Sequence, residues 1–229
     1  GKGGTGEIDR CVAIGHQAMD GTGSLGGTQN IFIGNDAGGG TWTTAASNSN
    51  VAIGATAMSA ALNGALGNTA LGHDTLKALT SGDNNVAVGS GAGDALTTGY
   101  SNVLIGKDVL GVADGGEQNN VVIGFNAGSA INHNSTAANV IIGSHAGVGG
   151  TGYISRNVII GDDALVDLNS RNSIYNTIVG SEAGGGTWAG DGTENTVLGY
   201  QAFKGAVNGA NFNTVVGSQA GKAITTGDN

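Results

Sequence analysis

A nine-residue pattern of polar and apolar positions returns twelve times along the chain. A typical copy is Asn120–Gly128: Asn, a branched residue, an apolar residue, Ile/Val/Leu, Gly, two polar residues, Ala, and then Gly or a larger apolar residue. The glycines at position five recur every 17 to 20 residues, at Gly15, Gly34, Gly54, Gly72, Gly89, Gly106, Gly124, Gly143, Gly161, Gly180, Gly199 and Gly217. Three apolar residues cannot bury themselves alone, so the pattern predicts a solenoid of stacked repeats.

Positions two to four of each repeat are predicted to form a short β-strand that ends at the glycine. Side chains alternate along a strand, so positions two and four share one face and position three points to the other. Both faces are apolar and both need a cover. The 8 to 11 residues after position nine can form an outer strand and a turn that cover one face. We expect identical copies around a symmetry axis to cover the other.

Asn stands at position one of every repeat except the first, which has Cys11. Stacked rungs place equivalent side chains above one another, where amides can hydrogen-bond along the column. A ligand-binding array is the alternative, but the pattern favours a structural ladder. The column contains Asn30, Asn50, Asn68, Asn85, Asn102, Asn120, Asn139, Asn157, Asn176, Asn195 and Asn213.

The predicted fold is therefore an all-β, parallel β-solenoid (β-roll), with residues 1–229 as a single repeat region of twelve rungs of about 18 residues. Twelve rungs at about 4.8 Å would make a rod about 55–60 Å long. The chain begins at Gly1 without Met, and its end, Thr225–Asn229, resembles Thr80–Asn84, which leads into the next repeat. We therefore expect a fragment of a longer fibre protein.

Composition and charge limit the classes of molecule that the chain is expected to bind. The chain has 46 Gly, no Pro and 4% aromatic residues, so small and β-branched side chains must fill a narrow interior. A net charge of −9 with eight scattered basic residues predicts no nucleic-acid partner. No apolar run approaches the length of a membrane span, so we expect no membrane insertion.

Several segments resemble known fibre repeats. Asn50–Gly54, Asn85–Gly89 and Cys11–Gly15 are similar to the head repeats of trimeric autotransporter adhesins, which stack as a left-handed parallel β-roll. The longer unit, seen in Asn195–Ala202 and Ala95–Gly99, resembles repeats of bacteriophage tail fibres and related surface fibres. The resemblance covers about Cys11 to Asn229 and implies a homotrimer, in which two identical chains are the partners.

Three functional hypotheses follow. The first is a structural and adhesive shaft segment of a homotrimeric fibre in the virion tail of a bacteriophage, which attaches to a glycan or protein receptor on the host surface. The second is the head of a bacterial trimeric adhesin, located extracellularly at the cell surface. The third, a polysaccharide-degrading tailspike, requires two carboxylates across a cleft, and the repeat supplies no such pair.

The ionisable residues do not predict an enzyme. His16 and His73 fall at position six and His145 at position seven, in columns shared with Ser, Lys, Asp and Gln, which indicates a solvated turn. Asp162 and Asp163 are adjacent on the same turn, where solubility explains them better than acid–base catalysis. We expect no catalytic residues, no metal site and no cofactor. The Gly-rich segments Gly3–Ile8 and Gly149–Ile154 have Ile where a calcium-binding repeat needs Asp.

The two tryptophans lie in nearly identical segments, Ala37–Trp42 and Ala183–Trp188. An indole on an outer connection could stack against a sugar ring, which makes Trp42 and Trp188 candidate glycan-binding residues. The alternative is a hydrophobic plug that closes a long connection onto the roll, and the length of both connections favours it.

Overall fold

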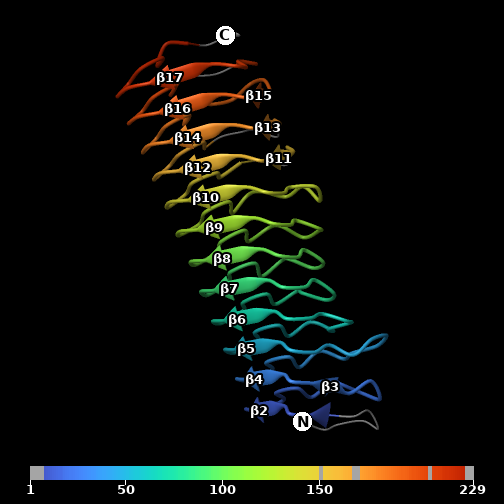
Figure 1. Ribbon diagram of the computed structural model, residues 1–229. Coiled ribbons are helices and arrows are strands. Elements are labelled where there is room, and N and C mark those ends of the chain that lie inside the picture. Colours follow the sequence, from blue (N-terminus) through green and yellow to red (C-terminus); the bar gives the residue numbers. More distant parts are fainter. Residues whose placement is uncertain (1–7, 150–151, 167–170, 206–207, 225–229) are drawn as a thin grey trace.

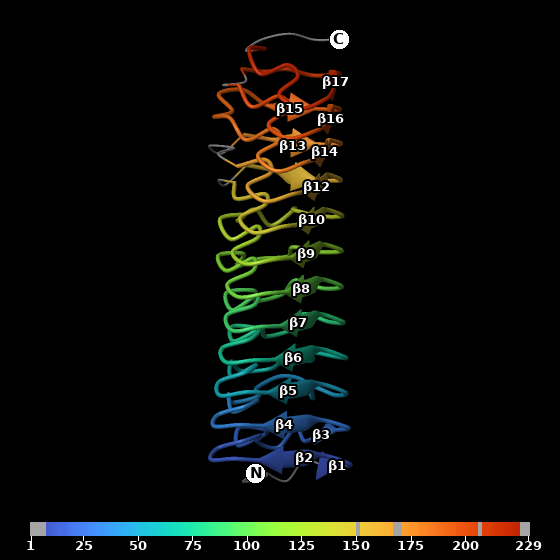
Figure 2. The same cartoon turned by 90° about the vertical axis from the view of Figure 1, so that its left-hand side faces the viewer.

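A computed structural model describes residues 8–149, 152–166, 171–205 and 208–224 (Figure 1). The segments Gly3–Ile8 and Gly149–Ile154 and the end segment Thr225–Asn229 lie wholly or partly outside these ranges. The chain forms a long stack of similar rungs, with its first rung at one end and its last rung at the other (Figures 1 and 2). The described secondary structure consists of β-strands joined by turns, which confirms the predicted all-β solenoid.

One parallel sheet runs the length of the stack, and its strands follow one another in chain order. It has twelve strands of three residues each, one per repeat, so the predicted strand triplets are confirmed. They are β2 (Val12–Ile14), β4 (Ile31–Ile33), β5 (Val51–Ile53), β6 (Thr69–Leu71), β7 (Val86–Val88), β8 (Val103–Ile105), β9 (Val121–Ile123), β10 (Val140–Ile142), β12 (Val158–Ile160), β14 (Thr177–Val179), β16 (Thr196–Leu198) and β17 (Thr214–Val216).

Every rung pairs in the same register, so like positions stack on like. Val140 of β10, for example, lies between Val121 of β9 and Val158 of β12. The backbone hydrogen bonds that hold this register join residues 17 to 20 positions apart, as between Val121 N and Asn139 O at 2.8 Å. Equivalent side chains therefore form columns along the whole stack.

The side chain at position three points into the solenoid. It is fully buried in most rungs, from Phe32 and Ala52 to Ile159 and Val197. The core also takes in position eight, which is buried from Ala18 to Ala202, as the small size of Ala at a tight corner predicts. One continuous hydrophobic cluster extends from Met19 to Val215. The interior of the roll therefore covers the inner face of the sheet.

The glycine at position five bends the chain where each strand ends. Gly124 has φ +141°, and a Cβ built there would lie 2.2 Å from the carbonyl oxygen of Gly143 on the next rung. An L-residue rarely adopts that φ, and any side chain would collide with backbone that cannot move without breaking the stack. The invariance of Gly in this column therefore follows from the close approach of neighbouring rungs.

The Asn column forms the predicted ladder. Each amide nitrogen donates to the side-chain oxygen of the preceding Asn, over distances of 2.9–3.3 Å, along ten consecutive pairs from Asn30 to Asn213. The same oxygens accept the backbone N–H of the following Asn, as between Asn139 N and Asn120 Oδ1 at 3.1 Å. These side chains are buried. The ladder therefore satisfies polar groups at an interior corner, where unpaired ones are costly.

The connections opposite the main sheet are only partly strand-like. Two-residue strands pair in parallel at the two ends of the stack: β1 (Ile8–Asp9) and β3 (Gly27–Thr28), then β11 (Ile154–Ser155), β13 (Ser173–Ile174) and β15 (Gly192–Thr193). Between them lie isolated bridges such as Tyr100 to Gln118. The predicted outer strand thus forms in some rungs only. Among the described residues, no helix has the length and hydropathy to cross a bilayer.

Candidate interaction surface

The outer face of the main sheet carries an uninterrupted stripe of side chains from positions two and four of the twelve strands, here called the outer stripe. All are Val, Ile or Leu except for Thr at position two of β6, β14, β16 and β17. These side chains are half-buried or exposed, and the exposed fraction reaches 48% at Leu198 and 61% at Val216. None is charged. The outer stripe is therefore an apolar surface that this chain does not cover.

The outer stripe is comparable in area to the largest apolar patches that soluble monomers expose. Twelve strands about 4.8 Å apart and about 10 Å long give a flat area on the order of 500 Å². The largest apolar patch on a soluble monomer is about 300–600 Å² and often marks an interaction site. The outer stripe also differs in shape from an ordinary patch, because it is narrow, straight and repeated at the spacing of the rungs. These properties make it the candidate interaction surface.

The structure places both tryptophans inside the solenoid, as the plug alternative predicts. The exposed fraction is 2% for Trp42 and 0% for Trp188. The ring of Trp42 packs edge-on against Phe32 with centroids 6.4 Å apart, and Trp188 packs in the same way against Phe203 at 6.2 Å. Neither indole presents a ring face to solvent, so in this structure neither Trp42 nor Trp188 is available to stack against a sugar.

A glycine stands against each indole. A Cβ built at Gly27 would lie 2.7 Å from Cζ3 of Trp42, and one built at Gly192 would lie 1.6 Å from Cζ3 of Trp188. Any larger residue at these two positions would collide with the indole. This contact between indole and glycine is a packing relationship that the repeat pattern alone does not reveal.

His16 and His73 are exposed, as expected for a solvated turn, whereas His145 is half-buried. His16 Nδ1 lies 3.2 Å from Asn35 Oδ1 on the next rung, and His73 Nδ1 lies 3.2 Å from Asp74 Oδ2. A hydrogen bond from the Thr56 hydroxyl, at 2.5 Å, is the main cause that lowers the pKa of Asp74, and Lys77 at 3.1 Å adds to the effect. The contacts His16–Asn35 and Thr56–Asp74 link neighbouring rungs along the polar edge of the roll, whereas His73 and Lys77 contact Asp74 within their own rung.

Near the C-terminal end this polar edge opens into a cavity of about 370 Å³. Its lining includes His145, Val148, Asp163, Val166, Glu182 and Lys204. The Lys204 ammonium pairs with the Glu182 carboxylate, which also accepts a hydrogen bond from Gln201 Nε2 at 3.2 Å. His145 Nδ1 lies 3.8 Å from Asp163 Oδ1. Sequence reasoning placed these residues on a solvated turn but did not bring His145 and Asp163 together, because the two are one full turn apart.

One carboxyl group is buried in a connection of the roll. Glu117 is fully buried, and its Oε2 accepts a hydrogen bond from the Gly115 N–H at 3.2 Å. Its Oε1 has no hydrogen-bond partner within the part of the chain that the structure describes. Burial raises the pKa of Glu117, and the nearby charge of Asp114 raises it further. The residue three positions before Asn is buried in every rung from Gly27 to Ala210, and in most of them it is Gly, Ala, Ser or Thr. A Glu in this column was therefore the signal for a buried carboxyl that sequence reasoning missed.

No protein-family model, curated protein sequence or solved structure matches the chain significantly.

Proposed function

We propose that this chain is a shaft segment of a homotrimeric fibre, of the kind that attaches a bacteriophage tail to its host. The observation that carries the proposal is the outer stripe: an apolar surface that runs the whole length of a rod and contains no charge. Burial of such a surface is strongly favourable, at about 25 cal/mol for each Å² removed from water. Two further copies of the same chain supply a matching stripe along its full length.

The shape of the outer stripe favours a symmetry axis parallel to the rod. Every rung presents its side chains at positions two and four in the same register, so copies that run in the same direction can match rung for rung. Cyclic symmetry produces this arrangement and closes on itself. A threefold axis lets each narrow stripe contact both neighbours and leaves the connections on the outside. Left-handed winding, which the resemblance to adhesin repeats implies, belongs to the same proposal.

The functional role that we propose is mechanical and adhesive. Stacked rungs joined by backbone hydrogen bonds and an Asn ladder make a stiff spacer, which holds a receptor-binding tip away from the virion. The outward connections vary in sequence from rung to rung and can themselves contact a glycan or a protein on the host surface. In a rod of this kind the repeats provide length and the connections provide diversity.

The oligomeric state tests the proposal directly. The wild-type chain of 22.2 kDa is expected to sediment as a trimer at micromolar concentration. Ile123→Lys places a charge in the centre of the outer stripe and is expected to give a folded monomer, because three ammonium groups would be buried around one axis. Ser135→Lys adds the same charge to an exposed connection of the same repeat and serves as the control. A wild-type monomer, or a trimer that survives Ile123→Lys, would contradict the proposal.

A second experiment separates a phage fibre from a bacterial adhesin, since the repeats resemble both. Antibodies against the purified chain are expected to label the tails of virions by electron microscopy. Labelling of bacterial cell surfaces in the absence of phage would instead support the adhesin alternative. Loss of plaque formation in the presence of the purified trimer would support a role in host attachment, and unchanged plaque numbers with virion labelling would support a spacer role alone.

A further inference from the structure

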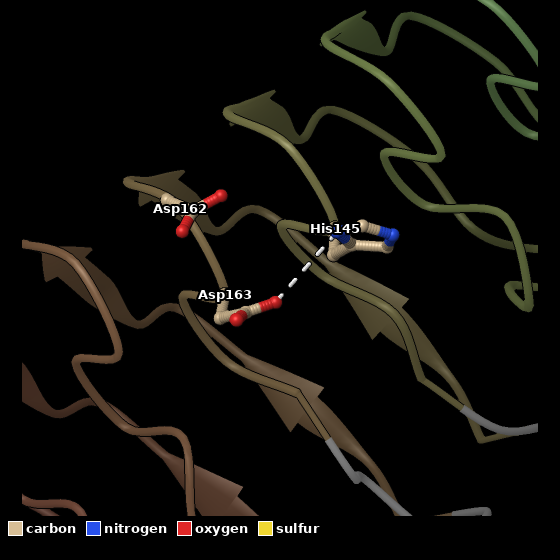
Figure 3. Close-up of side chains that lie close together, drawn as sticks. All are labelled: His145, Asp162 and Asp163. Carbon is tan, nitrogen blue, oxygen red and sulfur yellow. Dashed lines mark ion pairs between the residues drawn. The ribbon is translucent and has the colours of Figure 1, made fainter.

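One set of side chains on the polar edge has the composition of a metal site. Within residues 8–149, 152–166, 171–205 and 208–224, only His145, Asp162 and Asp163 form a group of three with potential ligand atoms close together. One atom of each side chain lies within 4.8 Å of the others. Figure 3 shows the Asp163 carboxylate facing the His145 imidazole from the neighbouring rung, with Asp162 directly before it in the chain.

The stacking of rungs holds these residues in place. His145 and Asp163 both stand at position seven, in the turns that follow β10 and β12. The backbone N–H of His145 donates to Phe125 O at 2.9 Å, and that of Asp163 donates to Ser144 O at 3.0 Å. Both residues have a left-handed backbone, with φ of 53° and 52°. The ladder thus fixes the Cα positions. The two carboxylates are exposed, whereas His145 is half-buried and its Nδ1 lies 3.0 Å from Ser144 Oγ.

The surroundings leave the two aspartates available to a cation. Within the part of the chain that the structure describes, His145 is the only basic side chain paired with either carboxylate. Lys204, which lines the same cavity, is paired with Glu182 of the preceding rung. The edge of the Phe125 ring packs against the imidazole, with centroids 5.2 Å apart, and limits its orientation. The cavity of about 370 Å³ beside His145 and Asp163 leaves room for an ion with bound water.

We propose that His145, Asp162 and Asp163 bind a divalent transition-metal ion, with zinc as the representative case. One imidazole and two carboxylates form a mixed nitrogen and oxygen ligand set, which suits Zn²⁺, whereas Mg²⁺ and Ca²⁺ prefer oxygen ligands alone. Ligand atoms around a tetrahedral zinc are about 3.3 Å apart. Exposed side chains reach that spacing by small rotations from their present positions. Water completes the coordination from the cavity.

A metal at this position ties one rung to the next. The imidazole belongs to the turn after β10 and the two carboxylates to the turn after β12, so the ion adds a cross-link to the backbone hydrogen bonds between them. An ion that binds the folded chain but not the unfolded chain raises the free energy of unfolding, by an amount that grows with the logarithm of the ion concentration. All three ligands come from one chain, so this inference goes beyond the proposed fibre function and does not depend on the trimer.

The test is a calorimetric titration of the untagged, metal-free chain with zinc chloride. Wild type is expected to bind one ion per chain saturably. His145→Ala and Asp163→Asn are each expected to lower the affinity for zinc at least about tenfold. Loss of a group that only supports a metal ligand already lowers metal affinity by about that factor. Titration with magnesium chloride should show no saturable binding.

His73→Ala is the matched control. His73 also contacts an aspartate, Asp74, but that carboxylate is engaged by Thr56 and Lys77, and among the described residues no third side chain joins the pair to make a metal-ligand group. The control is expected to bind zinc as wild type does. In addition, zinc should shift the ring NMR resonances of His145 and leave those of His73 in place. Absence of saturable binding, unchanged affinity in His145→Ala, or an equal loss in His73→Ala would overturn the proposal.

Discussion

The indole nitrogen of Trp188 donates a hydrogen bond to the backbone carbonyl of Gly184 at 2.9 Å, four residues earlier in the same connection. The indole nitrogen of Trp42, in a nearly identical segment, is buried without a hydrogen-bond partner among the described residues. The two repeats therefore use the same residue to fill the same interior volume, but only one of them satisfies its polar atom. This difference makes the two tryptophans a natural pair for mutagenesis.

Replacement of each tryptophan by phenylalanine should have unequal effects. Both substitutions remove the same atoms. Trp188→Phe also removes the hydrogen bond to Gly184, whereas Trp42→Phe removes a buried N–H that has no partner among the described residues. Trp188→Phe is therefore expected to lower the free energy of unfolding by about 1–3 kcal/mol more than Trp42→Phe. Urea denaturation at equal protein concentration measures the difference. Equal losses in the two variants would show that the hydrogen bond to Gly184 contributes nothing net.

The glycine column should not tolerate even a methyl group. Gly124→Ala places a Cβ 2.2 Å from Gly143 O in a backbone conformation that alanine rarely adopts. The expected loss is on the order of 4 kcal/mol or more, at the extreme of single substitutions. Gly111→Ala is the control, because its φ is not in the left-handed region and its nearest atom lies 3.6 Å away. Circular dichroism and thermal unfolding should separate the two variants, and similar melting temperatures would refute the explanation.

The Asn ladder should be sensitive to a single gap. Asn120 donates to Asn102 Oδ1 at 3.1 Å and to Thr136 O at 3.3 Å, and its oxygen accepts both the backbone and the side-chain N–H of Asn139. Asn120→Ala leaves several buried polar groups without partners and is expected to cost on the order of 3 kcal/mol. The measurement is urea denaturation.

Two comparisons make the ladder prediction specific. Asn134→Ala truncates an exposed amide in the same repeat and is expected to change stability by less than about 0.5 kcal/mol. Asn120→Asp keeps the acceptor oxygens but loses the donor and buries a charge, so it should be at least as damaging as Asn120→Ala near neutral pH. An Asn120→Ala variant as stable as the Asn134→Ala control would mean that the ladder does not contribute to stability.

The buried Glu117 should make stability depend on pH. Because its pKa is raised in the folded chain, the folded state holds the proton more tightly than the unfolded state does. This contribution favours folding at low pH and is lost as pH rises from the ordinary pKa of the side chain through the raised pKa. Glu117→Gln removes the titration and is expected to gain stability relative to wild type as pH is raised from about 5 to about 8.

The side-chain amide introduced by Glu117→Gln has a polar neighbour, Thr136. Thr136 stands at the equivalent place on the next rung, since Gln118 pairs with Ala137, and its hydroxyl oxygen is also buried without a partner in the described chain. Denaturation curves for wild type and Glu117→Gln at several pH values test the prediction. A stability difference that stays constant between pH 5 and 8 would show that Glu117 does not titrate as its burial requires.

What the sequence by itself determined is the repeating part of the structure. The strand triplets, the buried position three, the glycine bends and the Asn ladder all follow from a pattern that recurs every 17 to 20 residues. Each of these features depends on contacts between equivalent residues of adjacent rungs. When like stacks on like, one repeat contains the information for all of its neighbours. The polar turns after each strand could be placed for the same reason.

Only the tertiary structure decided the positions of residues that break the repeat. Whether Trp42 and Trp188 point inward depends on the room that Gly27 and Gly192 leave beside the two indoles, which is a property of packing rather than of pattern. Glu117 is buried because it stands three residues before Asn, in a column that is buried from Gly27 to Ala210. His145 and Asp163 share position seven of successive rungs, but only the structure gives the distance of 3.8 Å between Nδ1 and Oδ1. Such contacts are non-local, so the order of residues in any single repeat does not specify them.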